Sequence, residues 1–272
     1  MSWSPPPSWI QRWFPERWSE IAGNAAIKNL WMNFLMNGLC NLLITGPNRS
    51  GKTRVVSLGV RAQVCTARTS THDPCGKCAA CKALGEGRTV HNGVFAAMSG
   101  SEYSYHPIDC ENVTVEELDA LRYDGELDSD KVIVYLDEVG ALHRRRLEGK
   151  VLKLVDETPA IWIASAITVR SKKPLAGGKP PVERLSKELR GRFPVKIGSS
   201  HPHPDDLYQW IVDRCREWNI TILEEEVTIP AMIKRTRRRV GYVIHMFAFA
   251  ATRKNRTLSL DDVNRFNLDA ED

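Results

Sequence analysis

The residues with the clearest chemical meaning run from Gly46 to Thr53. This stretch, Gly-Pro-Asn-Arg-Ser-Gly-Lys-Thr, fits the phosphate-binding loop pattern G-x-x-x-x-G-K-[ST] at every fixed position. A strand-like apolar run at 41–45 precedes the loop and a helix-compatible run at 53–58 follows it, which is the context that the pattern requires. The glycines let backbone N–H groups face phosphate oxygens, and the following helix adds its positive N-terminal end. The sequence therefore predicts a nucleotide-binding site.

Individual roles follow from positions within the loop. We expect Lys52 to reach the β- and γ-phosphates, and Thr53 to place its hydroxyl on Mg²⁺. The alternative is a chance glycine-lysine turn before a helix, which a matching acidic strand farther along the chain makes a poor explanation. The predicted nucleotide-binding residues are Gly46, Pro47, Asn48, Arg49, Ser50, Gly51, Lys52, Thr53 and Arg54.

That acidic strand is Lys131-Val-Ile-Val-Tyr-Leu-Asp-Glu. Its five consecutive apolar residues indicate a strand buried on both faces, as in a parallel sheet. Carboxylates at the end of such a strand lie at the edge where doubly wound sheets bind ligands. We expect Asp137 to hold Mg²⁺, directly or through water, and Glu138 to act on the attacking water as general base. The alternative is a strand that turns into solvent through acidic residues.

Four cysteines after the phosphate-loop helix form a second candidate site. Two overlapping C-x-x-C steps and one further cysteine supply four thiolates, the tetrahedral set that structural zinc prefers. All four positions would be filled by protein, so the site should be structural rather than catalytic. The alternatives are a redox dithiol or unrelated buried thiols, and a flanking histidine could replace one ligand. The cysteines are Cys65, Cys75, Cys78 and Cys81, and the histidines are His72 and His91.

The apolar pattern supplies the framework that must position these residues. It alternates between strands and helices, which predicts an α/β fold with a parallel sheet. Strands are expected at 41–45, 105–110, 131–138, 161–165 and 194–198, with a further short strand at 94–98. Helices are expected at 27–35, 53–65, 115–122 and 143–156.

The chain divides into three parts. Residues 1–20 are a Trp- and Pro-rich arm, which either packs its rings onto the domain surface, the favoured case, or anchors a partner protein. Residues 21–200 form the nucleotide-binding domain, with the cysteines at 65–81. Residues 201–272 begin within the linker 199–204, and beyond it they have a purely helical pattern, with helices at 205–218, 225–235, 240–251 and from 259.

Charge and composition exclude some classes. No apolar stretch approaches the roughly 18 residues of a membrane span, and the N-terminus lacks the features of a signal peptide. We therefore expect a cytoplasmic protein with no membrane partner. The net charge of +5 is too mild to indicate nucleic-acid binding, so that case depends on local runs. Arg144–Arg146 and the basic run 234–239 either grip a phosphate backbone or form solvated helix ends.

Taken together, these motifs resemble the AAA+ ATPases of the clamp-loader group, and within it the tau/gamma ATPase subunits of bacterial clamp loaders. The resemblance covers about 14–266 and includes the segment 14–24, the phosphate loop, the cysteines just after its helix and the segment 135–142. It implies a P-loop AAA+ domain with a five-stranded parallel sheet, an inserted zinc knuckle and a small helical lid domain. It also implies ATP, Mg²⁺ and Zn²⁺ as cofactors.

The same resemblance implies roles for two further residues and a working context. Ser165 takes the sensor-1 place, and Arg192 takes the place of the arginine finger that reaches a neighbouring subunit's nucleotide. The implied activity is ATP hydrolysis in a homo- or hetero-oligomeric assembly that acts on DNA or on a DNA-bound protein such as a clamp or a helicase. The alternative is a nucleotide-binding scaffold with little or no hydrolysis.

Three features depart from the family pattern. Gly191-Arg-Phe193 replaces a serine-arginine-cysteine triplet, which makes Arg190 a rival finger. Gly241-Tyr-Val-Ile244 lacks the sensor-2 arginine, for which Arg238 or Arg239 is the candidate substitute. The sequence ends after the lid, so we expect no collar domain and a specialised relative, such as a phage, plasmid or mobile-element ATPase.

Overall fold

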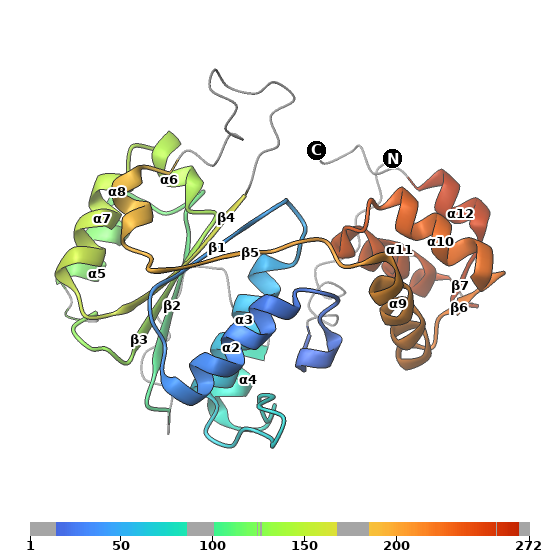
Figure 1. Cartoon of the computed structure of the whole chain (residues 1–272), viewed down its shortest axis with the longest axis horizontal. Coiled ribbons are helices and arrows are strands. Elements are labelled where there is room, and N and C mark those ends of the chain that lie inside the picture. The colour runs from blue at the N-terminus through green and yellow to red at the C-terminus, as the bar shows by residue number, and fades with distance from the viewer. Residues whose placement is uncertain are drawn as a thin grey trace.

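The computed structural model describes residues 15–85, 101–123, 125, 127–167, 185–253 and 255–266. They form a larger α/β domain and a smaller, mostly helical lid domain, joined through the segment that follows the last strand of the sheet (Figure 1). The strand expected at 94–98 lies outside the described residues.

A five-stranded parallel sheet forms the centre of the larger domain, with the strand order β2-β3-β4-β1-β5. Its strands are β1 (Leu42–Gly46), β2 (Ser104–Asp109), β3 (Val132–Asp137), β4 (Ile161–Ile167) and β5 (Val195–Gly198). The first five residues of β3 are all buried, which is the burial expected of an inner strand with helices on both faces. The predicted fold class is confirmed.

Helices cover both faces of the sheet (Figure 1). Side chains alternate between the two faces, so Ile133 packs in one core with Trp31, whereas Val134 packs in the other with Trp162. The first face carries α2 (Ala25–Asn37), α3 (Lys52–Val64) and α4 (Ala79–Gly85). The second face carries α5 (Val115–Tyr123), α6 (Gly140–Arg144), α7 (Glu148–Glu157) and α8 (Lys187–Gly191).

The lid domain has its own core, which includes Leu207, Met246 and Phe247. Its helices are α9 (Pro204–Trp218), α10 (Glu225–Arg235), α11 (Val240–Thr252) and α12 (Leu260–Arg265). The expectation of a purely helical pattern is wrong in one respect, because β6 (Thr221–Ile222) pairs in parallel with β7 (Thr257–Leu258). Strands of two residues are too short to show an alternating pattern in the sequence.

The expected helix at 143–156 is also wrong. The chain instead forms α6 and α7, separated by a turn in which Arg146 has a left-handed φ of 58°. The N–H of Leu147 donates to the carbonyl of Leu142 at 2.9 Å, which closes the end of α6. The arginine triplet 144–146 therefore lies at the end of a helix and in the following turn, rather than at a helix start.

Candidate functional site

The phosphate loop joins the end of β1 to the start of α3, at the carboxyl edge of the sheet. Lys52 is 7 % exposed, and its Nζ donates to the carbonyl oxygens of Gly46 at 3.0 Å and Pro47 at 2.9 Å. The ammonium group of Lys52 is therefore held over the loop, where phosphate oxygens would lie. A Cβ on Gly46 would overlap the side chain of Ser199, so this position requires glycine.

Three hydroxyl groups surround the carboxylate of Asp137 at the same edge. Ser165 Oγ donates to Asp137 Oδ1 at 2.5 Å, and Tyr135 Oη donates to that oxygen at 2.6 Å. Thr53 Oγ1 lies 3.3 Å from both carboxylate oxygens. Burial, together with the charge of Asp137, raises the pKa of Tyr135, so its hydroxyl keeps the proton that it donates. A carboxylate beside a hydroxyl offers hard oxygen ligands, which fit Mg²⁺.

Glu138 directly follows this carboxylate, with a left-handed φ of 52°. Its backbone N–H donates to Ser165 Oγ at 3.2 Å, which ties the turn to β4. Burial, the charge of Glu111 and the charge of Asp137 raise the pKa of Glu138 to about 7, while Lys52 opposes the shift. A carboxylate that titrates near neutral pH is suited to accept a proton from water.

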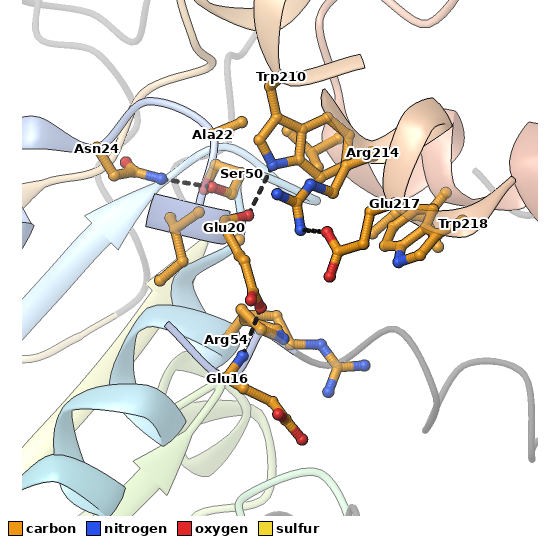
Figure 2. Close-up of a pocket in the computed structure, with 15 residues that line it drawn as sticks. Glu16, Glu20, Ala22, Asn24, Ser50, Arg54, Trp210, Arg214, Glu217 and Trp218 are labelled. Atoms are coloured by element: carbon orange, nitrogen blue, oxygen red, sulfur yellow. Dashed lines mark hydrogen bonds and ion pairs between the residues drawn. The ribbon is translucent and has the colours of Figure 1, made fainter. Parts of the chain in front are cut away.

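A pocket of about 270 Å³ opens beside the phosphate loop, between the two domains (Figure 2). Its walls include Trp210 and Ile244 of the lid, Ala22 of the segment before α2, and Arg54 of α3. Burial lowers the pKa of Arg54 to about 10, and the charge of Asp137 opposes this. The mixture of aromatic, apolar and charged walls, and the pocket's place next to the loop, fit the nucleoside part of a nucleotide.

Asn24 holds this region together. Its Nδ2 donates to the carbonyl of Ser50 at 3.0 Å (Figure 2), and its Oδ1 accepts from the N–H of Ser200 at 3.3 Å. The hydroxyls of Ser50 and Ser199 are 2.6 Å apart. Across the pocket, Trp210 Nε1 donates to the carbonyl of Glu20 at 2.6 Å. The phosphate loop, the segment before α2 and the start of the lid are therefore linked directly.

Arg192 lies at the other edge of the sheet. It precedes β5, and its carbonyl accepts from the side chain of Asn41, which precedes β1, so it is at the amino edge of these parallel strands. Its guanidinium forms two parallel bonds with Asp156 of α7, at 2.5 and 2.7 Å. The phosphate loop is at the carboxyl edge, so the structure does not bring Arg192 together with the nucleotide site of its own chain.

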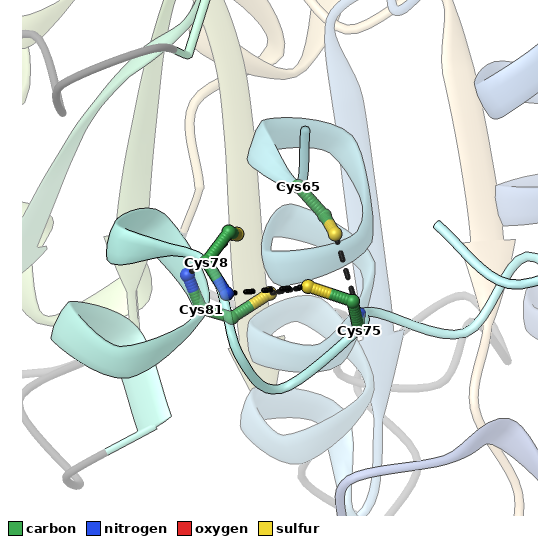
Figure 3. A group of neighbouring side chains, drawn as sticks. All are labelled: Cys65, Cys75, Cys78 and Cys81. Atoms are coloured by element: carbon green, nitrogen blue, oxygen red, sulfur yellow. Dashed lines mark hydrogen bonds between the residues drawn. The ribbon is translucent and has the colours of Figure 1, made fainter. Parts of the chain in front are cut away.

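The four cysteines form one cluster (Figure 3), with sulfur atoms all within 4.8 Å of one another. Backbone N–H groups point at three of the sulfurs: Cys75 N donates to Cys65 Sγ, Cys78 N to Cys75 Sγ and Cys81 N to Cys78 Sγ. Burial opposes ionisation of Cys78, but N–H groups of Cys81 and Thr66 outweigh it and lower its pKa to about 6. This donor set fits zinc, and no histidine joins it in the part of the chain that the structure describes.

One tryptophan of the N-terminal arm falls within the described residues, and it packs onto the loop of this cysteine cluster. Trp18 is buried, its N–H donates to Asp73 Oδ1 at 2.8 Å, and its Nε1 donates to the carbonyl of His72 at 3.2 Å. The arm is thus fixed to this loop through the backbone of His72 and the side chain of Asp73.

Comparison with known proteins supports the architecture. No protein-family model and no curated protein matches the sequence. The structure is similar to that of RuvB from Thermotoga maritima, described as a Holliday junction branch migration motor, with a TM-score of 0.55 and 14% identity over 93% of this chain and 71% of that one. A threonine-to-valine variant of RuvB gives a TM-score of 0.56 and 15% identity with the same coverage. The chain shares the fold of these RuvB structures.

At this low identity the likeness establishes the fold alone. In the part of the chain that the structure describes, no helix is both long and apolar enough to cross a membrane.

Three residues of the candidate site were not identified from the sequence: Asn24, Trp210 and Tyr242. Tyr242 is 4 % exposed in the first turn of α11, where the sensor-2 segment was expected, and its ring lies 4.3 Å from the guanidinium carbon of Arg49. Only Asn24 carried a usable signal, because the Gly23-Asn24 pair before a helix marks a turn. Both lid residues act through contacts with segments far away in the sequence.

Proposed function

We propose that this protein is a Mg²⁺-dependent ATPase. The observation that carries the proposal is the contact between Thr53 Oγ1 and the carboxylate of Asp137, at 3.3 Å. Lys52 directly precedes Thr53 in the sequence, and Glu138 directly follows Asp137. This arrangement combines a phosphate-binding cation, a pair of Mg²⁺ ligands and a base within one edge of the sheet. The pocket between the domains adds space for the nucleoside.

The reaction that these residues support is an in-line attack of water on the γ-phosphorus of ATP. Glu138 orients the water and accepts its proton, because its raised pKa makes it a better base than an ordinary carboxylate. Lys52 stabilises charge on the phosphate oxygens as the bond to the β,γ-bridging oxygen breaks and ADP leaves. Mg²⁺ bound by Thr53 and Asp137 would offset further charge. Ser165 positions Asp137 through its 2.5 Å hydrogen bond.

The active form, in this proposal, is a homo- or hetero-oligomeric AAA+ assembly. Arg192 supports it, because this arginine lies at the sheet edge opposite its own phosphate loop and therefore needs a neighbouring subunit to contribute to hydrolysis. The substrate of the assembly is DNA or a DNA-bound protein, such as a clamp or a helicase. Support comes from the clamp-loader-like motifs and from the similarity to RuvB, which is described as a branch migration motor.

Zinc is proposed to bind the four cysteines as a structural ion.

A nucleotide-binding scaffold with little hydrolysis is the second candidate function. It is favoured by the segment Gly241–Ile244 at the start of α11, which contains a tyrosine and lacks the arginine expected of sensor 2.

A steady-state assay of phosphate release, with and without DNA, separates the two functions. The ATPase proposal requires Mg²⁺-dependent release that Glu138→Gln abolishes while ATP binding persists. A scaffold would bind ATP tightly and release no phosphate above the level of the Glu138→Gln variant under any condition. Stimulation by DNA would support the proposed substrate, whereas equal rates with and without DNA would favour a protein substrate.

A further inference from the structure

The phosphate loop contains an arginine where the backbone favours glycine. Arg49 has a φ of 58°, in the left-handed region that glycine adopts without strain and other residues rarely adopt. Gly51, two residues later, has a φ of 86° in the same half of conformational space. Strained backbone of this kind persists only where surrounding contacts hold it, and such contacts concentrate at functional sites. The side chain of Arg49 therefore needs an explanation.

That side chain reaches the lid. The guanidinium carbon of Arg49 lies 4.3 Å from the centroid of the Tyr242 ring, well inside the range of a cation–π contact. The ring is almost fully buried, so water screens the contact little. The first turn of α11 also passes close to the stem of Arg49, because a Cβ on Gly241 would lie 3.7 Å from the Cβ of Arg49.

A second arginine shares the same ring from the lid side. Arg239, just before α11, has its guanidinium carbon 5.6 Å from the Tyr242 centroid, and its Nη1 donates to Tyr242 Oη at 3.4 Å. Arg49 thus contacts the ring of Tyr242, whereas Arg239 contacts both the ring and the hydroxyl. The hydrogen bond of Arg239 can be removed separately, since phenylalanine keeps the ring and loses the hydroxyl.

The first turn of α11 also forms part of the nucleotide pocket, through Val240 and Ile244. One turn of helix therefore contacts both the pocket wall and the loop that would surround the triphosphate. We propose that the Arg49–Tyr242 contact couples the phosphate loop to the lid, so that a nucleoside triphosphate bound at the loop sets the position of α11. Arg49 and Tyr242 are positioning residues in this account, which rests on the proposed ATP binding.

The contact itself is tested first without nucleotide. Arg49→Gly relieves the backbone strain and Tyr242→Leu removes the ring, and each should speed amide hydrogen exchange in 240–247 about fivefold or more. Tyr242→Phe keeps the ring and Arg49→Lys keeps a cation, so both variants should retain the slow exchange of the parent protein. Arg216→Ala, which removes an exposed arginine elsewhere in the lid, is the matched control. Tyr242→Leu also removes the contacts of Arg239, so in a double-mutant cycle the double variant Arg49→Gly/Tyr242→Leu should exchange no faster than Tyr242→Leu alone.

The coupling is tested by repeating the exchange with a non-hydrolysable ATP analogue and Mg²⁺, and by steady-state kinetics. In the parent protein the analogue should slow exchange in 240–247, and Tyr242→Leu should abolish that response while the analogue still binds. kcat should fall about tenfold with a smaller change in KM, because the loop's own phosphate contacts remain.

Additive effects of the two substitutions, or Tyr242→Phe behaving like Tyr242→Leu, would overturn the Arg49–Tyr242 contact. Binding of the analogue without any exchange response in the parent protein would overturn the coupling. A parent protein that binds no ATP would instead refute the proposed function and the coupling together, while the nucleotide-free measurements would still decide whether the contact exists.

Discussion

Thr53 and Asp137 lie 84 positions apart in the sequence, yet the hydroxyl of the one is 3.3 Å from both carboxylate oxygens of the other. This proximity follows from the parallel sheet. β1 and β3 flank β4 and end at the same edge, so the last residue of β3, Asp137, and the loop that follows β1 face a common space.

Lys52→Ala should abolish ATP binding, because it removes a cation that contacts the phosphates in the ground state. Glu138→Gln should bind ATP normally and lose hydrolysis by about a hundredfold or more, since it removes only the group that acts on water. Binding of a fluorescent ATP analogue and phosphate release measure the two effects separately. Hydrolysis by Glu138→Gln at the parental rate would show that another group is the base.

The rate of hydrolysis should depend on pH through Glu138, whose pKa is raised to about 7. The base acts when it has lost its proton, so kcat/KM, which reports the pKa of the free enzyme, should be low below this pKa, rise through it and level off above it. Glu111→Gln removes one of the negative charges that raise the pKa, and should therefore move the rise to lower pH. The measurement is kcat/KM at limiting Mg-ATP across this range. If Glu111→Gln does not shift the pH profile, the rise in kcat/KM does not report the titration of Glu138.

The protein should contain one zinc ion per chain, held by the four clustered cysteines. Cys78→Ser should lose the metal and lower the free energy of unfolding by several kcal/mol, because structural zinc contributes directly to folding. ATP affinity should survive, because the 13 residues of α3 separate the cluster from Lys52 by about 20 Å. Elemental analysis and thermal unfolding measure the first two effects. Zinc-free protein after purification without chelators would contradict the site.

Arg192→Ala should bind ATP normally and hydrolyse it about a thousandfold more slowly, because an arginine supplied by a neighbour stabilises charge on the transferring phosphoryl group. Mixing this variant with Lys52→Ala should restore part of the activity, since one partner offers an intact nucleotide site and the other an intact finger. Arg190→Ala is the matched control and should keep parental activity. No rescue between folded, co-assembling variants would exclude Arg192, and a loss in the control would transfer the role to Arg190.

Replacing Arg144–Arg146 with alanine should weaken DNA binding and flatten its dependence on salt. The reason is that binding with fewer phosphate contacts releases fewer counterions. The turn that carries the triplet lies near the carboxyl end of β2, where Arg144 pairs with Glu111 and Arg145 donates to the carbonyl of Cys110. Binding isotherms over a series of salt concentrations give the slope. An unchanged slope would assign the triplet to a solvated turn, and the same substitutions in the run 234–239 would then test the lid.

The strands and the two chemical motifs could be predicted because their signals are local. β3 is apolar at every inner position, and the fixed residues of the phosphate loop stand within eight positions. The break between α6 and α7 could not be predicted, because nothing in the sequence distinguishes Arg146, which has a left-handed backbone, from an arginine inside a helix. The contacts of Tyr242 and Trp210 with the nucleotide-binding domain could not either, because they depend on how the lid docks.

The position of β1 has a consequence for the synthesis of this protein. Leu42 begins the strand that leads into the phosphate loop, yet the two residues opposite it in the sheet, Ile163 and Val195, belong to strands that the ribosome makes much later. Until those strands emerge, β1 has unpaired N–H and C=O groups along both edges and exposed apolar side chains, which favours aggregation and the binding of chaperones. The phosphate loop is thus encoded early and positioned late, so a chain interrupted before β5 contains the loop sequence without the complete sheet that holds it.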